Sequence, residues 1–309
     1  MALRGLRLHP SLRVVLVGSC VLLLGLVLVS FLRREKRLLV RETKVVAVTD
    51  TVVETSPNSS SSSLLFLPCA KTVSKERKQR NVLSHLANQL KRELGQTECR
   101  LIELQKRLGE QDSGRVASSG GWCYQDSRAD SLEHKFDASL ADALSALFRD
   151  QHVGSLGEGP GMYKRHLLQM GLVRSYHAYD GAPFIEESSK GEVTFLDLTV
   201  PQYDLPIFDW ILCLEVAEHI PPQFEDIFLD NIVRHARKGV VLSWAKLMQE
   251  GLEHVNNKNA EDVIKLLREK GFEVDTEASF ALKKVSTFFW FQENVNVYRR
   301  IQTFDESEA

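Results

Sequence analysis

The sequence has no surplus of positive charge. Among its 309 residues, lysine and arginine number 39 and aspartate and glutamate number 41, which gives a formal net charge of −2. Proteins that bind nucleic acids need clustered basic side chains to neutralise phosphates, so the composition gives no reason to expect a nucleic-acid partner. The length exceeds that of one ordinary domain of about 150–200 residues, and we expect further segments beside a folded domain.

The sequence also lacks a C-x-x-C pair, which disfavours a zinc cluster. Its five cysteines are an odd number at wide spacings, unlike a disulfide framework: Cys20, Cys69, Cys99, Cys123 and Cys213. In a lumenal, oxidising compartment one bridge among Cys69, Cys99 and Cys123 is feasible, and their spacing does not select the pair.

Charged side chains are absent from Val14–Leu32, a run of 19 residues. A helix of that length spans about 28 Å, close to the thickness of a bilayer core. A signal peptide is the alternative, but its apolar region would be shorter and would end at a cleavage site of small residues. Because the basic cluster 33–37 follows instead, we predict a short tail at 1–13 and a transmembrane signal anchor at 14–32.

Two signals disagree about the orientation of this anchor. Basic residues are more numerous after the span than before it, and the positive-inside rule then places the C-terminal part in the cytosol. Asn58-Ser59-Ser60 is a glycosylation sequon, however, and the order of tail, anchor, stem and domain resembles that of type II Golgi enzymes. We adopt the lumenal orientation and expect a single-pass type II membrane protein of the Golgi or endoplasmic reticulum.

Between the anchor and the folded domain we expect a flexible stem at 33–73, a helix at 74–111 and a glycine- and serine-rich linker at 112–130. Leucines on the helix follow coiled-coil spacing, with a four-residue shift that is typical of a stutter. They are Leu83, Leu86, Leu90, Leu94, Leu101, Leu104 and Leu108. The stripe predicts either a helix packed on its own domain or a stalk that forms a homo-oligomer.

From residue 131 to 301 the pattern alternates between helices and strands, which predicts a parallel, doubly wound α/β sheet. Residues 302–309 then form a tail. Asp137 is expected to cap the first helix, and a short strand leads into a glycine-rich segment. Later helices are predicted at Met162–Gln169, Gln223–Ala236 and Asn259–Lys270, and later strands at Val173–Asp180, Glu192–Thr199, Phe208–Val216, Gly239–Ala245, Phe272–Asp275 and Phe288–Tyr298.

The glycine-rich segment holds Gly157, Gly159 and Gly161 in alternate positions before a helix. Alternate glycines permit positive φ angles and let a ligand approach the main chain at a helix N-terminus. A dinucleotide fingerprint would need glycine at 162, which is Met162, and this disfavours a nicotinamide oxidoreductase. With this G-x-G-x-G spacing the chain resembles class I S-adenosylmethionine (SAM) methyltransferases over about residues 135–300. The resemblance implies SAM as cofactor and a Rossmann-like sheet with an antiparallel C-terminal edge.

Carboxylates follow two of the expected strands. Asp180 ends the second strand, where a carboxylate can accept hydrogen bonds from both ribose hydroxyls, although Asp180-Gly181 is also a common turn pair. Asp197 ends the third strand at the position where the family reads the adenine amino group, and the resemblance then places Leu198 against the ring. The alternative for Asp197 is an ordinary carboxylate at a strand end.

The run 208–220 also matches the family, because an apolar strand ends in Glu215, Glu218 and His219. In relatives its end lies beside the transferred methyl, which implies that Glu215 contacts the cofactor and that all three residues are candidates for catalysis. His219 and His254 are the candidate bases, since an imidazole titrates near neutral pH. The alternatives are a solvated strand end and, for His254, a structural histidine.

Ser243-Trp244-Ala245 and His254-Val255-Asn256 complete the resemblance, to a group of largely uncharacterised methyltransferase-domain proteins. The chain departs from the family at Ser155, where an acidic residue normally helps to organise the methionine end of SAM. We ask whether Glu158, inside the glycine loop, replaces it. The loop 246–253 also departs, because in relatives it is rich in glycine and proline.

The sequence thus predicts SAM-dependent methyl transfer to an unidentified acceptor, with two alternatives. A metal-assisted mechanism like that of small-RNA 3′-end 2′-O-methyltransferases would use Glu215, Glu218 and His219, with His254 or His235 as the second histidine. A non-catalytic scaffold would keep the fold and use the helix for assembly.

Overall fold

The computed structural model describes residues 63–110, 115–123 and 134–301, with side chains from residue 73 onward. The predicted anchor at 14–32, the sequon and the tail 302–309 lie outside these residues. Within the described ranges, no helix is long and apolar enough to cross a membrane. The chain divides into two compact units, Met1–Cys69 and Ala70–Ala309, and the sheet lies in the second.

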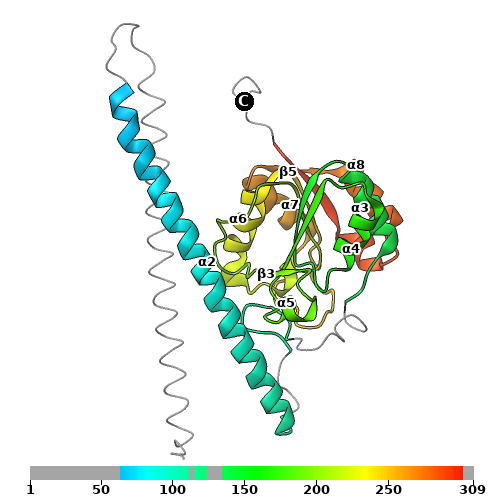
Figure 1. Ribbon diagram of the computed structural model, residues 1–309. Coiled ribbons are helices and arrows are strands. Elements are labelled where there is room, and N and C mark those ends of the chain that lie inside the picture. The colour runs from blue at the N-terminus through cyan, green and yellow to red at the C-terminus, as the bar shows by residue number, and fades with distance from the viewer. Residues whose placement is uncertain (1–62, 111–114, 124–133, 302–309) are drawn as a thin grey trace, which may run out of the picture. The chain divides into compact units, whose positions relative to one another are not determined.

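A seven-stranded sheet in the order β3-β2-β1-β4-β5-β7-β6 organises this unit (Figure 1). Its strands are β1 (His152–Leu156), β2 (Ser175–Asp180), β3 (Thr194–Phe195), β4 (Phe208–Cys213), β5 (Ala236–Leu242), β6 (Phe272–Asp275) and β7 (Asn296–Arg300). The first five are parallel, and β7 is antiparallel to both of its neighbours. The predicted parallel sheet with an antiparallel C-terminal pair is confirmed, with β6 as the outermost strand.

Helices cover both faces of the sheet, and β4 shows how its residues divide between two cores. Trp210 and Leu212 pack into one core and Ile211 and Cys213 into the other, because successive side chains of a strand point to opposite faces. The first core is covered by α3 (Ala138–Leu147), α4 (Met162–Met170), α5 (Ile185–Ser188), α8 (Thr276–Val285) and α9 (Phe289–Asn294). The second is covered by α6 (Glu225–His235) and α7 (Ala260–Glu269).

The predicted strand at Phe288–Tyr298 is wrong in its first half, which forms α9, and α8 has no counterpart among the predicted elements. Aromatic residues favour strands, and the run Phe288–Phe291 therefore suggested one. In the structure the carboxylate of Asp137 caps α3 as expected and also accepts hydrogen bonds from the N–H groups of Thr287 and Phe288. These bonds fix the turn that begins α9.

One long helix, α2 (Ser63–Arg107), covers the predicted helix 74–111 up to Arg107 and begins earlier, within the predicted stem. Its polar side packs on the domain. Ser84 donates to the carbonyl of Pro201, Gln96 donates to the carbonyl of Pro183, and the carboxamide of Asn88 donates to the carbonyl of Phe195. The stripe leucines other than Leu94 are exposed, by 41% to 82%. The two alternatives for this helix are therefore not exclusive, because it packs on its own domain while the stripe faces solvent.

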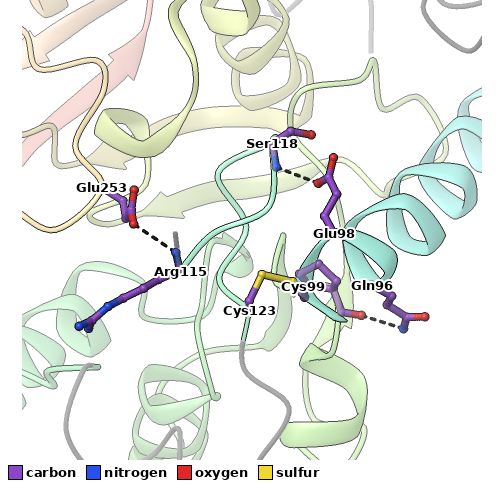
Figure 2. Close-up of a disulfide and its surroundings, with 8 residues drawn as sticks. Gln96, Glu98, Cys99, Arg115, Ser118, Cys123 and Glu253 are labelled. Atoms are coloured by element: carbon purple, nitrogen blue, oxygen red, sulfur yellow. Dashed lines mark hydrogen bonds between the residues drawn. A yellow bond between two sulfur atoms is a disulfide. The ribbon is translucent and has the colours of Figure 1, made fainter. Parts of the chain in front are cut away.

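The predicted linker at 112–130 contains a folded piece, the hairpin Arg115–Cys123. Cys123 donates its backbone N–H to the carbonyl of Arg115, and Val116 bridges to Trp122. A disulfide joins Cys99 of α2 to Cys123, so that both ends of the bond are part of the second unit (Figure 2). Of the three bridges that were feasible among Cys69, Cys99 and Cys123, the structure contains the one between Cys99 and Cys123.

Candidate functional site

A cavity of about 570 Å³ opens at the carboxyl ends of β1, β2 and β4. This is where ligands bind in open parallel α/β sheets, and the volume is that of an ordinary small-molecule site. The glycine loop, both predicted aspartates, Leu198, Glu215, His219 and His254 line it. The cavity therefore collects the predicted site residues, with two exceptions: Gly161, which ends the glycine loop, and Glu218, which lies behind the wall with no exposed surface.

The glycine loop joins β1 to α4, and all three of its glycines have positive φ angles, between 64° and 91°. At Gly157 the packing is also decisive, because a Cβ there would lie 2.1 Å from Cγ2 of Val216. Gly161 ends the loop as the N-cap of α4, so the free N–H groups of that helix face the loop. The loop can thus cradle a ligand with its main chain.

Glu158 supplies a carboxylate beside Ser155, the position at which the family has an acidic residue. The side chain of Glu158 is only 7% exposed and accepts hydrogen bonds from the backbone N–H of Lys164 at 2.7 Å and from the hydroxyl of Tyr176 at 2.7 Å. Ser155 contributes a further hydrogen bond. Burial raises the pKa of Glu158, and these donors offset the effect only in part.

Asp180 at the end of β2 braces the glycine loop. One carboxylate oxygen accepts the N–H of Gly159 at 2.8 Å and the other accepts the N–H of Ala182 at 2.7 Å. The residue therefore makes the turn expected from Asp180-Gly181 and also faces the cavity. Each carboxylate oxygen has a second lone pair, so ribose hydroxyls can still be bound.

Asp197 is almost fully buried between the cavity and helix α2. Its Oδ1 accepts the N–H of Thr199 at 2.7 Å and the hydroxyl of Thr199 at 2.6 Å. Its Oδ2 accepts no hydrogen bond from the described residues and lies 3.9 Å from Nζ of Lys91. Asn88 accepts the backbone N–H of Asp197 at 2.9 Å. Sequence reasoning missed both α2 residues, because nothing local links them to position 197.

After β4 the chain places Glu215 in the left-handed region, at φ 55°. Such a backbone is costly for a residue other than glycine and is common at functional sites. The Glu215 carboxylate accepts hydrogen bonds from the hydroxyl of Ser243 at 2.7 Å and from the carboxamide of Asn294 at 3.0 Å. Burial raises its pKa, and these two donors oppose the shift.

Glu218 has a pKa raised well above its usual range, first by burial and then by the negative charge of Glu215. Its two carboxylate oxygens have no hydrogen-bond partner of normal geometry among the described residues. Such an environment favours the protonated form of the carboxyl group unless a cation compensates its charge.

His219 and His254 lie together, with ring centroids 5.1 Å apart. The Nδ1 atom of His219 is 3.1 Å from the carbonyl oxygen of Glu253. Because a carbonyl only accepts hydrogen bonds, Nδ1 carries the proton and Nε2 is left as the acceptor. Burial lowers the pKa of His219 to about 4, so the ring is neutral near pH 7. Burial also lowers the pKa of His254.

The Ser-Trp-Ala and His-Val-Asn motifs meet in space. The indole of Trp244 donates to the carbonyl of Asn256 at 2.5 Å, and the backbone N–H groups of Val255 and Asn256 donate to the carbonyl of Glu218 at 2.9 and 3.0 Å. Together they fix His254 beside His219, which explains how two separated motifs serve one site.

The four residues of the metal-assisted alternative are only partly assembled. Single ligand atoms of Glu218, His219 and His254 lie within 4.8 Å of one another. Glu215 is not part of this group, and its carboxylate is held by Ser243 and Asn294. His235 is a buried residue of α6 whose Nε2 lies 3.0 Å from the carbonyl of Gln202, so the prediction of His235 as an alternative ligand is wrong.

The cavity has two walls that sequence reasoning missed. One is aromatic: Phe289, Trp290 and Phe291 of α9 line it, and Phe289 is 65% exposed. The other is the hairpin, from which Gly120, Gly121 and Trp122 line it. The run of aromatic residues was visible in the sequence but was assigned to a strand, and the hairpin has the composition of a linker.

A comparison of the chain with models of protein families gives no match, and a comparison with curated proteins gives none either. Solved structures do match. Magnesium protoporphyrin IX methyltransferase from Synechocystis PCC 6803 with bound SAM is 18% identical, with 53% of this chain and 79% of that chain covered and a TM-score of 0.39. The methyltransferase CcbJ from Streptomyces caelestis is 10% identical, with 56% and 95% covered and a TM-score of 0.43. The methyltransferase domain of bacterial CtHen1-C is 14% identical, with 53% and 97% covered and a TM-score of 0.40.

The architecture itself carries the assignment of the fold. Strands β1 to β5 form the doubly wound parallel part, an antiparallel β7 lies between β5 and β6, and the glycine loop follows β1. The features that the resemblance implied are thus present together in one domain. The α/β part of this chain thus has the Rossmann-like fold that class I methyltransferases have.

Proposed function

We propose that this domain transfers the methyl group of SAM to an acceptor that remains to be identified. One observation carries the proposal: the glycine loop, Asp180 and Asp197 line the same cavity as a neutral His219. Cofactor-binding groups and a proton acceptor therefore face one space, as methyl transfer requires. A scaffold would have no need for this convergence.

At the cofactor end, each residue offers a distinct contact. Asp180 would accept the ribose hydroxyls with the lone pairs that its two backbone bonds leave over. Asp197 would accept the adenine amino group through Oδ2, which has no hydrogen-bond partner among the described residues. Leu198, 6% exposed, would lie against the ring. Glu158 would take the place of the missing acidic residue at position 155 and face the methionine amino group.

At the transfer end, the protein must hold the acceptor in line and remove its proton. SAM supplies an activated methyl group on a sulfonium, so charge disperses in the reaction and alignment provides most of the catalysis. Nε2 of His219 carries no proton, so it can accept a hydrogen bond from the hydroxyl or amine of the substrate that receives the methyl group. Glu215 would contact the methionine end, and His254 would restrict how the His219 ring turns.

The test is calorimetric titration of the full-length protein in detergent with SAM and with S-adenosylhomocysteine. We expect both to bind. Labelled methyl transfer from SAM to membrane extracts should then be detected with the wild type and be lost in His219→Ala, while SAM still binds to that variant. Absence of SAM binding by the wild type would overturn the proposal and favour the non-catalytic scaffold.

A metal-assisted mechanism is the second candidate, supported by the group Glu218, His219 and His254. A divalent ion holds its ligands at about 2.0–2.2 Å, so the ligand atoms of one ion lie about 3 Å apart and this group would have to contract. A bound ion would explain a buried Glu218 without hydrogen-bond partners. The bound ion would polarise the oxygen of the substrate that receives the methyl group, and His219 and Glu218 would orient the ion.

The two candidates differ in Mn²⁺ binding, which can be followed by electron paramagnetic resonance without knowledge of the acceptor. The metal mechanism requires that wild-type protein bind Mn²⁺ and that Glu218→Gln and His254→Ala abolish binding. Glu215→Gln is the matched control, because that carboxylate is already held by Ser243 and Asn294. Lack of Mn²⁺ binding by the wild type would exclude this candidate for manganese-like ions.

For location, we propose a type II membrane protein anchored by residues 14–32, with its domain in the lumen of the Golgi or endoplasmic reticulum. The Cys99–Cys123 disulfide supports this orientation, since disulfides persist in oxidising compartments and are rare in the cytosol. The sequon at Asn58 points the same way.

For assembly, we propose that a second copy of the chain covers the leucine stripe of α2. Ser84, Asn88 and Gln96 face the domain and occupy positions away from the stripe. The leucines recur at coiled-coil spacing and are exposed, which suits an identical helix as partner.

A further inference from the structure

The hairpin Arg115–Cys123 is attached at three points, two on helix α2 and one on the loop before His254 (Figure 2). The disulfide joins its end to Cys99, and the carboxylate of Glu98 accepts the backbone N–H of Ser118 at 2.9 Å. On its other side, the carboxylate of Glu253 accepts the backbone N–H of Arg115 at 3.2 Å. Helix α2 and the loop before His254 thus hold the hairpin between them.

The tip of the hairpin lies against both ends of the cavity. A Cβ on Gly121 would be 2.1 Å from the carbonyl oxygen of Gly181, which follows the ribose-binding candidate Asp180. A Cβ on Gly120 would be 2.3 Å from the carbonyl oxygen of His219. Both contacts are with backbone, which cannot give way as a flexible side chain can. Two adjacent glycines therefore let one strand of chain touch the cofactor side and the catalytic side together.

Two further contacts reach His219. The ring of Trp122 meets the ring of His219 edge to face, with centroids 5.6 Å apart. The side chain of Glu253 accepts a hydrogen bond from the backbone N–H of Arg115. The backbone carbonyl of the same residue accepts a hydrogen bond from Nδ1 of His219. The orientation and the tautomer of His219 therefore depend on groups that the hairpin contacts.

We propose that the hairpin Arg115–Cys123 is a disulfide-fastened wall of the active site, with Gly121 shaping the adenosyl end and Trp122 acting as a positioning residue for His219. The inference rests on the proposed function, because that function identifies one end of the cavity as the adenosyl end and the other as the catalytic end. The hairpin carries no reacting group, and it acts by excluding water and fixing neighbours that do. The disulfide matters because only hydrogen bonds and packing would otherwise hold its end.

Substituting each glycine alone distinguishes the effect of the hairpin on the cofactor end of the cavity from its effect on the catalytic end. In full-length protein, Gly121→Ala should weaken SAM binding by about tenfold, which corresponds to about 1.4 kcal/mol. Gly120→Ala should leave SAM affinity within about twofold and shift the nuclear magnetic resonance signal of the ¹³C-labelled His219 ring. Gly109→Ala is the control, since Gly109 has nearly the same φ as Gly120, 87° against 89°, and no atom within 4 Å of an added Cβ.

Removal of the disulfide tests the fastening without need of SAM or an acceptor. In Cys99→Ser/Cys123→Ser, backbone hydrogen exchange of 116–122 and of 217–220 should be faster by about tenfold than in wild type, and Trp122→Leu should accelerate 217–220 alone. Cys69→Ser is the control for loss of a cysteine.

Unchanged exchange at 217–220 in both variants would overturn the proposal even if SAM binds. If the wild type fails to bind SAM while exchange responds as expected, the proposed function falls and the fastening stands.

Discussion

The carbonyl oxygen of Glu253 lies 3.1 Å from Nδ1 of His219 and belongs to a residue whose backbone is in the left-handed region, at φ 59°. A residue other than glycine pays about 1–2 kcal/mol for this conformation. The hydrogen bond from Arg115 to the Glu253 side chain helps to hold it there. The proton on Nδ1 of His219 is thus fixed by a strained loop, and Nε2 is free to act as acceptor.

We predict that His219 titrates far below an ordinary histidine. Burial lowers its pKa to about 4, so its ¹³C-labelled ring signal should be constant from pH 8 to about 6 and change only near pH 4. The unfolded chain binds the proton with a pKa near 6.5 and the folded chain less readily. This histidine therefore reduces the free energy of unfolding as the pH falls from about 6.5 towards 4 and has no effect above. A midpoint near 6.5 would contradict the burial of this ring.

Gly159→Val should abolish SAM binding while the protein stays folded. The φ of Gly159 is 64°, and an added Cβ would lie 3.0 Å from Nδ1 of His134, on the cavity side of the loop. Gly171→Val is a matched control, because Gly171 has φ 65° and no atom within 4 Å of an added Cβ. Both should lose about 1–2 kcal/mol of stability. Calorimetry and thermal unfolding measure the two effects, and equal SAM affinity in both variants would be incompatible with a cofactor loop.

Glu158→Gln should weaken SAM binding by about tenfold. The carboxylate accepts several hydrogen bonds, and a carboxamide offers one acceptor oxygen in place of two, so a buried donor is left without a partner at a cost of about 1–3 kcal/mol. Glu192→Gln is the control, since Glu192 is 43% exposed and pairs with Arg165 at the surface. Unfolding should be measured alongside affinity. An unaltered SAM affinity would show that Glu158 only stabilises the loop.

Strand ends were the part of the site that the sequence could predict. Asp180 ends one predicted strand and His219 follows another, and parallel strands bring their carboxyl ends to one edge. The contribution of α2 could not be found in this way. Asn88 and Asp197 are bonded across 109 positions, and no local pattern links them.

Composition misled at two places for physical reasons. Gly120 and Gly121 suggested a flexible linker, whereas glycine is needed at both positions because an added Cβ would lie only 2.3 and 2.1 Å from backbone carbonyl oxygens. Phe289 and its aromatic neighbours suggested a strand, but a helix begins there, after a turn in which the N–H groups of Thr287 and Phe288 donate to Asp137.

Leu86→Glu with Leu90→Glu should convert a dimer into a monomer. These side chains are 48% and 41% exposed within one copy, so charges there leave the domain intact and disfavour a helical partner. His85→Glu, an exposed position outside the stripe, is the control. Analytical ultracentrifugation of the full-length protein measures the state. A monomeric wild type would exclude a second copy as the occupant.

The lumenal orientation predicts a glycan at Asn58. Removal of N-glycans should then increase the gel mobility of the full-length protein, and the domain should be protected from protease in intact microsomes. Cys99 and Cys123 should resist alkylation until a reductant is added, because they form the disulfide. Unchanged mobility together with protease cleavage of the domain in intact microsomes would place the domain in the cytosol.

Because of the contacts of α2, the part of the chain that forms the candidate site begins well before the first strand. Asn88 holds the backbone of Asp197, Lys91 lies near its carboxylate, and Cys99 fastens a wall of the cavity. A fragment beginning at residue 131 would contain every strand and the whole glycine loop, yet it would lack these groups. An inactive preparation of such a fragment would therefore say nothing about catalysis by the intact chain, and the shortest informative fragment begins before Asn81, which bonds to Asp204.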